Sequence, residues 1–204
     1  MEMKKLSLFA LFALLCLGLA SCGGSSSSDS GSDKTVSVDR LMADAASMVG
    51  DTVTVEGVCS HLCKHGGRKA FLVGSADSVM VRCEAYPLMG EPFPKSTIRH
   101  PLAVRGVVRE ERIDEETVRK METQYAEAMK AQADSVAATA GESAAEHENG
   151  CSTERAAKGQ KDITSFEGRM ADYRAKIAAR EAKEGKAYLS FYYLDAISYE
   201  ILPD

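Results

Sequence analysis

The sequence lacks the local motifs that mark the common hydrolases and nucleotide-binding enzymes. It contains no G-x-S-x-G nucleophile elbow, no glycine-rich phosphate loop and no H-E-x-x-H zinc helix. An excess of positive charge is also missing, since 25 Lys and Arg residues face 30 Asp and Glu residues in a chain of 204. Proteins that coat nucleic acid need a basic surface that releases phosphate counterions. The sequence therefore argues against an enzyme and against nucleic acid as the partner.

One long apolar run is present, and it lies at the N-terminus. Lys4 and Lys5 precede apolar residues 6–19, a run that is too short to span a bilayer comfortably and that ends in small residues. This pattern is typical of a secretory signal peptide, here residues 1–21. Its removal leaves about 180 residues, enough for one domain with additions.

The end of this segment resembles the lipobox of bacterial lipoproteins: Leu19, Ala20, Ser21 and Cys22. The resemblance implies cleavage before Cys22, a diacylglycerol on its sulfur and acylation of the new amine. Each buried methylene of such chains contributes roughly 0.8 kcal/mol to membrane binding, so two lipid signals hold firmly. Gly23 after the lipid cysteine is similar to lipoproteins sent to the outer membrane. We therefore expect an exported protein anchored in the outer membrane, on its periplasmic or surface face, with the membrane as a partner.

The mature chain begins with a polar linker and then alternates apolar and polar residues. Residues 22–35 are rich in Ser, Gly and Asp, a composition that favours a flexible tether. A short amphipathic helix is indicated from Asp39 to Gly50, where a helix would stop. Gly66 and Gly67 are typical of a tight hairpin. Period-two alternation predicts five strands, at 52–59, 69–73, 79–85, 102–113 and 188–202, with a bulge or bend at Gly106.

Residues 114–186, between the fourth and fifth strands, have the pattern of helices. Asp114 and the two glutamates after it favour a helix start, and Thr164 with Glu167 forms a capping box for a second helix. Two apolar stripes at helical spacing suggest an antiparallel hairpin, joined by a connection, 137–161, that we expect to be poorly ordered. The stripes are Val118, Met121, Tyr125 and Met129, and Phe166, Met170, Tyr173 and Ile177.

The predicted strands begin with a meander, and the first of them contains Gly57. This arrangement resembles the OB-fold, a small Greek-key barrel. Residues 38–74 are similar to the start of lipid-anchored OB-fold proteins of Bacteroidetes and, more distantly, to the anticodon-binding-like OB superfamily. The resemblance implies a mainly β fold with an α insertion, in which residues 36–113 supply strands 1–4 and residues 187–204 supply strand 5. Together with the missing catalytic motifs, this fold leads us to expect a non-enzymatic binding or interaction module, whose helical hairpin offers a surface to an envelope protein.

Four cysteines remain after the signal peptide and the lipid cysteine, and three of them lie between residues 59 and 83. Cys59, His61, Cys63 and His65 alternate, so an extended strand would place all four on one face, about 6.6–7 Å apart pairwise. Thiolate and imidazole suit zinc or copper, which makes a metal-handling envelope protein one alternative function. The other interpretation is that Cys59 continues the buried row of the strand while both histidines are solvated.

A disulfide is the use of these thiols that an exported protein favours. Cys83 shares the core-facing parity of its strand and is the expected partner of Cys59 or Cys63. Closing a loop of about 20 residues would stabilise the fold by roughly 3 kcal/mol. Cys151, in the loose connection, is then the odd thiol.

A basic turn carries the third functional hypothesis. Lys64, His65, Arg68 and Lys69 cluster at the first hairpin, and loops beside the first strands of an OB barrel commonly meet oligonucleotides or sugars. An anionic ligand or nucleic acid would bind there. Against this, Phe71 is the single aromatic residue of the second and third predicted strands, and short charge clusters are commonly solvated faces. We therefore rank an interaction module without a cofactor first, metal handling second and anion binding last.

Overall fold

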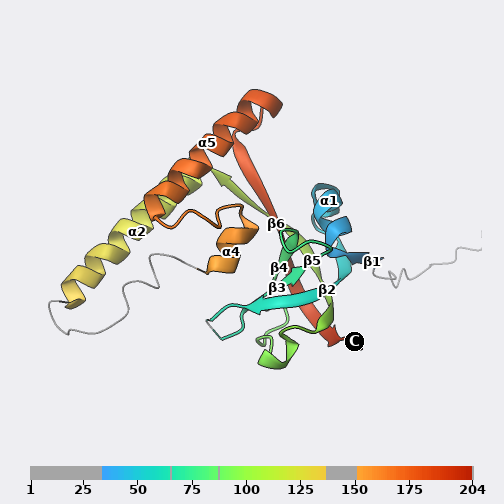
Figure 1. Ribbon diagram of the computed structural model, residues 1–204. Helices are drawn as coiled ribbons and strands as arrows, with labels where there is room; N and C mark the ends of the chain where they lie inside the picture. Colours follow the sequence, from blue (N-terminus) through green and yellow to red (C-terminus); the bar gives the residue numbers. More distant parts are fainter. Residues whose placement is uncertain (1–33, 65, 87, 137–150, 204) are drawn as a thin grey trace, which may run out of the picture. The chain divides into compact units, whose positions relative to one another are not determined.

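The computed structural model describes residues 34–64, 66–86, 88–136 and 151–203 (Figure 1). The predicted signal peptide, Cys22, most of the tether and His65 lie outside the described residues. None of the helices in the described part of the chain is long and apolar enough to cross a membrane. The elements are β1 (Lys34–Ser37), α1 (Val38–Met48), β2 (Thr52–Leu62), β3 (Lys69–Val73), β4 (Met80–Glu84), η1 (Lys95–Thr97), β5 (Pro101–Asp114), α2 (Glu115–Val136), α4 (Ser152–Ala157), α5 (Phe166–Glu184) and β6 (Tyr188–Ile201).

Five of these strands close into a barrel. The hydrogen-bonded order is β2-β3-β4-β6-β5, and β5 pairs back with β2 over residues 52–58 of that strand. β4 and β6 run parallel, the other neighbours in the barrel are antiparallel, and β1 adds a parallel pairing along β2. This closed five-stranded arrangement is the OB-fold. The predicted fold class, a mainly β barrel with an α insertion, is confirmed.

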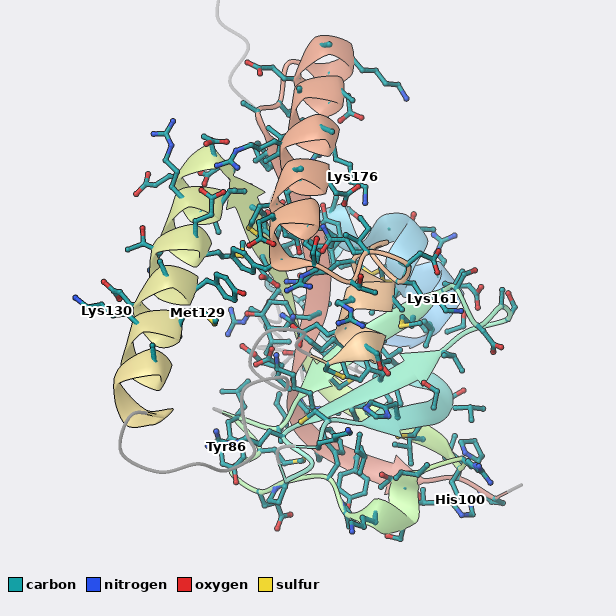
Figure 2. All side chains as sticks on the ribbon, turned by 60° about the vertical axis from the view of Figure 1, so that its left-hand side comes forward. Tyr86, His100, Met129, Lys130, Lys161 and Lys176 are labelled. Carbon is teal, nitrogen blue, oxygen red and sulfur yellow. The ribbon has the colours of Figure 1, made fainter. Side chains whose placement is uncertain are left out.

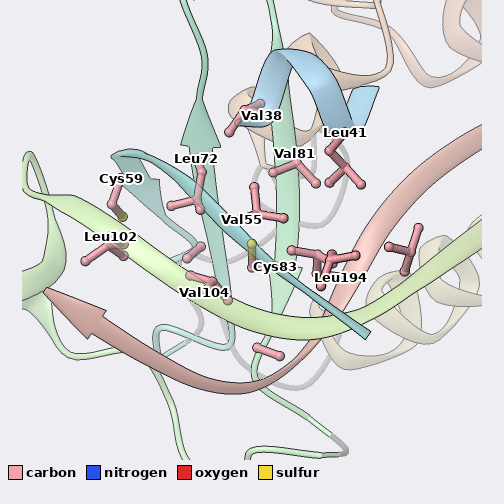
Figure 3. Close-up of a cluster of buried hydrophobic side chains, with 14 of the residues drawn as sticks. Val38, Leu41, Val55, Cys59, Leu72, Val81, Cys83, Leu102, Val104 and Leu194 are labelled. Atoms are coloured by element: carbon pink, nitrogen blue, oxygen red, sulfur yellow. The ribbon is translucent and has the colours of Figure 1, made fainter. Parts of the chain in front are cut away.

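The barrel interior is filled by alternate residues of its strands (Figure 3). On β2, Val53, Val55 and Cys59 point inward, as the alternation predicts, and α1 adds Val38 and Leu41 to the same core. Removal of this apolar surface from water contributes about 25 cal/mol per Å². Fully buried members from the other strands are Ala70, Leu72, Val81, Cys83, Leu102, Val104, Val108, Leu194 and Ala196.

The insertion between β5 and β6 forms a second, smaller core. α2 and α5 pack as an antiparallel pair beside one end of β5 and β6 (Figure 1), which confirms the predicted helical hairpin. Tyr125 stacks on Phe166 with ring centroids 4.0 Å apart, and Arg174 donates to both Glu115 and Glu122 across the pair. The buried members of this core are Ile113, Val118, Met170, Tyr173 and Ile177.

Local features differ from the sequence prediction at four places. The cap of α5 is Ser165, whose hydroxyl accepts the Gly168 N–H, and not Thr164. Met129, predicted on the helical seam, is 41% exposed. β1 begins within the expected tether because its backbone pairs with β2. α4 lies within the connection, 137–161, that was expected to be poorly ordered, and its contacts define the site described next.

Candidate functional site

A β-bulge in β2 separates the residues of the predicted metal cluster. Cys59 pairs with Leu72 and faces the interior, whereas His61 pairs with Phe71 on the outer face, and the register shifts between them. An extra residue in one strand reverses which side chains face the core. The predicted alternation of four ligands on one face therefore does not hold beyond Cys59.

Cys63, the other described member of that cluster, has a different use. Cys63 is buried, and its sulfur accepts the backbone N–H of Lys69 at 3.3 Å. Over the described ranges, no three His, Cys, Asp or Glu side chains are placed to hold a metal ion. His65 lies outside those ranges, so no zinc or copper ligand set is assigned.

The disulfide predicted among Cys59, Cys63 and Cys83 is not formed. All four cysteines between residues 34 and 203 that the structure describes are free thiols. Cys59 and Cys83 lie in the barrel interior (Figure 3), where burial raises the pKa of both thiols above the ordinary value. They behave as small apolar core residues, which was the alternative interpretation for Cys59.

The outer face of the barrel carries a row of ring-bearing and cationic side chains. The strand register places His61, Phe71, Arg82 and Tyr193 side by side on β2, β3, β4 and β6. The Arg82 guanidinium lies 4.6 Å from the centroid of the Tyr193 ring, and the rings of His61 and Phe71 are 6.0 Å apart. Phe71 is fully buried although it does not belong to the barrel core. A further layer therefore covers this face.

Helix α4 supplies that layer, because its contacts flank Phe71 on both sides of the row. The helix and its two capping residues use side chains at positions i, i+3 and i+7, which lie on one helix face. Each of these side chains reaches a different strand of the barrel. The contacts are Cys151 Sγ to His61 Nε2 at 3.6 Å, Glu154 Oε1 to Arg82 Nη1 at 2.8 Å, and Lys158 Nζ to Glu111 Oε1 at 2.9 Å.

Arg82 is the centre of the charge network under α4. Its Nε lies 3.0 Å from Glu84 Oε1, its Nη1 2.8 Å from Glu154 Oε1, and its Nη2 3.1 Å from Glu111 Oε2. Lys69 Nζ lies 3.1 Å from both oxygens of Glu154. The Arg82 side chain is 11% exposed, so salt screens these pairs less than surface pairs.

Burial opposes the ionisation of Glu154 and Glu111, but neighbouring cations outweigh it. The charges of Lys69, Arg82 and Lys158 hold the pKa of Glu154 below its ordinary value. Lys158 and Arg82 lower the pKa of Glu111 in the same way. Both carboxylates are therefore ionised at neutral pH, and the α4 face is held by full charges.

α4 relies on these polar contacts and not on an apolar core of its own. None of its residues is buried, and two cavities are lined in part by its side chains. One cavity, of about 70 Å³, is lined by Met42, Ala157 and Tyr192 among others. The second, of about 180 Å³, has Met121 and Phe166 in its wall. The helix therefore has little packed apolar surface to lose if it moves.

The basic turn predicted to bind anions contributes Lys69 to this network. Lys64 and Arg68 are exposed. The guanidinium of Arg68 lies 5.2 Å from the centroid of the Tyr86 ring, which is labelled in Figure 2. The sequence indicated Lys69 but not the carboxylate that it binds, which lies 85 residues later in the chain. No local pattern joins residues at such a separation, so this half of the site was missed.

No protein family model matches the chain, and no curated protein matches it. Among solved structures, the telomere capping protein Ten1 from Saccharomyces pombe is 17% identical, covers 38% of this chain and 69% of its own, and has a TM-score of 0.29. A chain of the S. pombe Stn1–Ten1 complex is 19% identical, and the match covers 39% of this chain and 67% of that chain with a TM-score of 0.30. The fold assignment rests on the strand order itself. It defines the class: an OB-fold protein whose outer face is covered by part of its own helical insertion.

Proposed function

We propose that this protein is a non-enzymatic module that binds a partner protein on the outer face of its barrel. The docking of α4 carries this proposal, because the face of β3, β4 and β6 already holds a helix through charged and ring-bearing side chains. The second and third strands of OB barrels, here β3 and β4, commonly form the ligand face. The ligand class that fits is a short helical segment of a protein.

Charge complementarity favours a peptide over a nucleic acid at this face. Lys69 and Arg82 attract a carboxylate, but Glu84 and Glu111 stand beside them and repel a chain of phosphates. α4 and its C-terminal cap pair with charges of both signs on the face, since they present an acidic and a basic side chain one helical turn apart. A partner segment with the same Glu-x-x-x-Lys spacing matches the face.

Binding of a synthetic peptide with the sequence of residues 150–161 tests the proposal. The protein is the mature-length chain with Cys22→Ser and Glu154→Ala, and the labelled peptide is followed by fluorescence anisotropy. We expect saturable binding that is lost when Arg82→Gln is added and retained with the control Arg40→Gln, whose side chain pairs with Asp44 on α1.

Two further probes decide the ligand class. A peptide in which the glutamate is replaced by glutamine should bind at least about tenfold more weakly, since it lacks the carboxylate that pairs with Arg82. An oligothymidine of 12 nucleotides should not compete. Equal binding of both peptides, or binding of the oligonucleotide alone, would overturn the proposal.

We further infer that the module is held at the outer membrane through a lipid on Cys22. The lipobox-like residues 19–22 and the polar linker behind them support this. The mass of the N-terminal peptide from isolated envelopes tests the inference. An unlipidated N-terminus, or unchanged membrane fractionation of Cys22→Ser, would contradict it.

A further inference from the structure

The contacts of α4 indicate how the chain itself regulates its binding face. This inference rests on the proposed function. We infer that α4 is an intramolecular ligand: it occupies the face in the free protein and leaves it when a partner segment with the same charge spacing competes. The free protein would then be autoinhibited, and partner binding would expose α4.

Occupation follows from the groups that α4 uses. The carboxylate of Glu154 pairs with both cations of the face, Lys69 and Arg82. Lys158 pairs with Glu111. Lys158 Nζ also lies 5.4 Å from the centroid of the Phe191 ring. A partner carboxylate cannot reach Arg82 Nη1 while Glu154 lies 2.8 Å from it. Partner and α4 are therefore mutually exclusive.

Three features of α4 keep the free-energy cost of its release from the face small. α4 has six residues, and isolated helices of that length are marginal in water. It has no buried residue, and the two cavities beside it show incomplete packing. Its strongest contacts are ion pairs, which a ligand of the same charge pattern replaces one for one.

Competition in the same chain is nevertheless effective. A tethered segment acts at an effective concentration in the millimolar range, so even a weak cis interaction keeps the face occupied. The apparent dissociation constant of a partner rises in inverse proportion to the fraction of protein whose face is open. If the face is open in one molecule in ten or fewer, the partner binds at least about tenfold more weakly.

Anisotropy with the 150–161 peptide measures this effect. We expect the wild-type face to bind at least about tenfold more weakly than Glu154→Ala, while the matched control Glu127→Ala, an exposed glutamate of α2, behaves like wild type. Circular dichroism and the thermal midpoint confirm that each variant keeps the barrel. Equal, Arg82-dependent binding by wild type and Glu154→Ala would leave the binding function standing and overturn autoinhibition. Absence of binding in every variant would overturn both.

Cys151 reports the position of α4 independently of affinity. Cys59, Cys63 and Cys83 are at most 7% exposed, so alkylation of the folded barrel falls on Cys151, which can be resolved from other thiols by peptide mass spectrometry. Saturating peptide, with serine in place of its own cysteine, should increase the alkylation rate of Cys151 in the wild-type chain severalfold without changing the barrel thiols. A rate that the bound peptide leaves unchanged would mean that α4 stays docked, against the inference.

Discussion

The guanidinium of Arg82 lies 4.6 Å from the ring centroid of Tyr193 on the neighbouring parallel strand. With one side of the group against this ring, its nitrogens reach three carboxylates, of which one belongs to α4 and two to the barrel. Arginine suits this place because its planar fork presents fixed donors, whereas lysine presents one point charge. The stacked pair therefore fixes where a carboxylate can bind on the outer face.

Replacement of Arg82 by lysine tests this relationship. We expect Arg82→Lys to lower the free energy of unfolding by about 1–3 kcal/mol, because a single ammonium group cannot keep all three ion pairs and leaves carboxylates without partners. Urea denaturation followed by circular dichroism measures the change. The control is Arg119→Lys, whose side chain is 73% exposed and pairs with Glu115 on the same helix. It should change stability by no more than about 0.5 kcal/mol. Equal losses in the two variants would contradict the central place of Arg82.

The lowered pKa of Glu154 predicts that acid releases α4. A carboxyl whose pKa is lower in the folded state than in the unfolded state stabilises the fold above its unfolded pKa and ceases to do so as pH falls through the folded value. The charges around Glu154 place the folded value below the ordinary range for glutamate. The contribution of Glu154 should therefore be complete at pH 6, begin to fall as pH passes the ordinary glutamate pKa of about 4.3, and disappear only below the lower folded value.

Glu154→Gln isolates that contribution. The difference in unfolding free energy between wild type and Glu154→Gln should be largest at pH 6 and shrink steadily as pH falls through the folded pKa of Glu154, because the protonated wild-type carboxyl resembles the amide. Urea denaturation at each pH gives the two curves. A difference that stays constant with pH would show that Glu154 acts through packing and not through charge.

The barrel could be predicted from the sequence because its signals are local. The bounds of β3 (Lys69–Val73) coincide with those predicted for the second strand, since alternation and the glycine pair of the hairpin both fix them. The predicted irregularity at Gly106 is confirmed by the register shift between β5 and β6. α1 begins within one residue of Asp39 and ends before Gly50, as its pattern indicates.

The candidate site could not be predicted because its parts are joined only in space. α4 has the sequence STERAA, which carries no apolar stripe, and its order depends on ion pairs to residues 47 to 85 positions away. The bulge after Cys59 has no glycine to mark it, so the side chains beyond it, His61 included, were placed on the wrong face. Parity arguments fail wherever one unmarked residue is inserted in a strand.

Gly57 on β2 allows the barrel to approach α1 closely. A Cβ at this position would lie 2.6 Å from Cγ2 of Val38 and 2.9 Å from the backbone oxygen of Val73. Gly57→Ala should therefore lower the free energy of unfolding by about 1–3 kcal/mol, because the backbone atom cannot give way as a side chain can. In chemical denaturation, adding Val38→Ala should recover part of this loss, so the two changes should be less than additive. Strict additivity would show that the clash with Val38 is not the cause.

Thiol chemistry separates the core cysteines from Cys151. Burial raises the pKa of Cys59 and Cys83, and the thiolate is the reactive form, so both should resist alkylation in the folded protein at pH 8. Cys151 is partly exposed and should react at least about tenfold faster, since its thiol can be reached without opening the barrel. Peptide mass spectrometry after timed iodoacetamide treatment measures each rate.

The same reagent decides between thiols and a disulfide in protein taken from its own compartment. The free cysteines of the structure predict that unfolding without a reductant makes Cys59, Cys63, Cys83 and Cys151 all reactive. Cys59 and Cys83 should nevertheless become alkylated only when the barrel unfolds, because both side chains fill its interior. As the urea concentration increases, the alkylation rates of both thiols should therefore rise in parallel. Cys151 should already be modified at urea concentrations too low to unfold the barrel. A peptide pair that stays joined until reductant is added would establish a disulfide instead, and with it a barrel packed differently around Cys59 and Cys83.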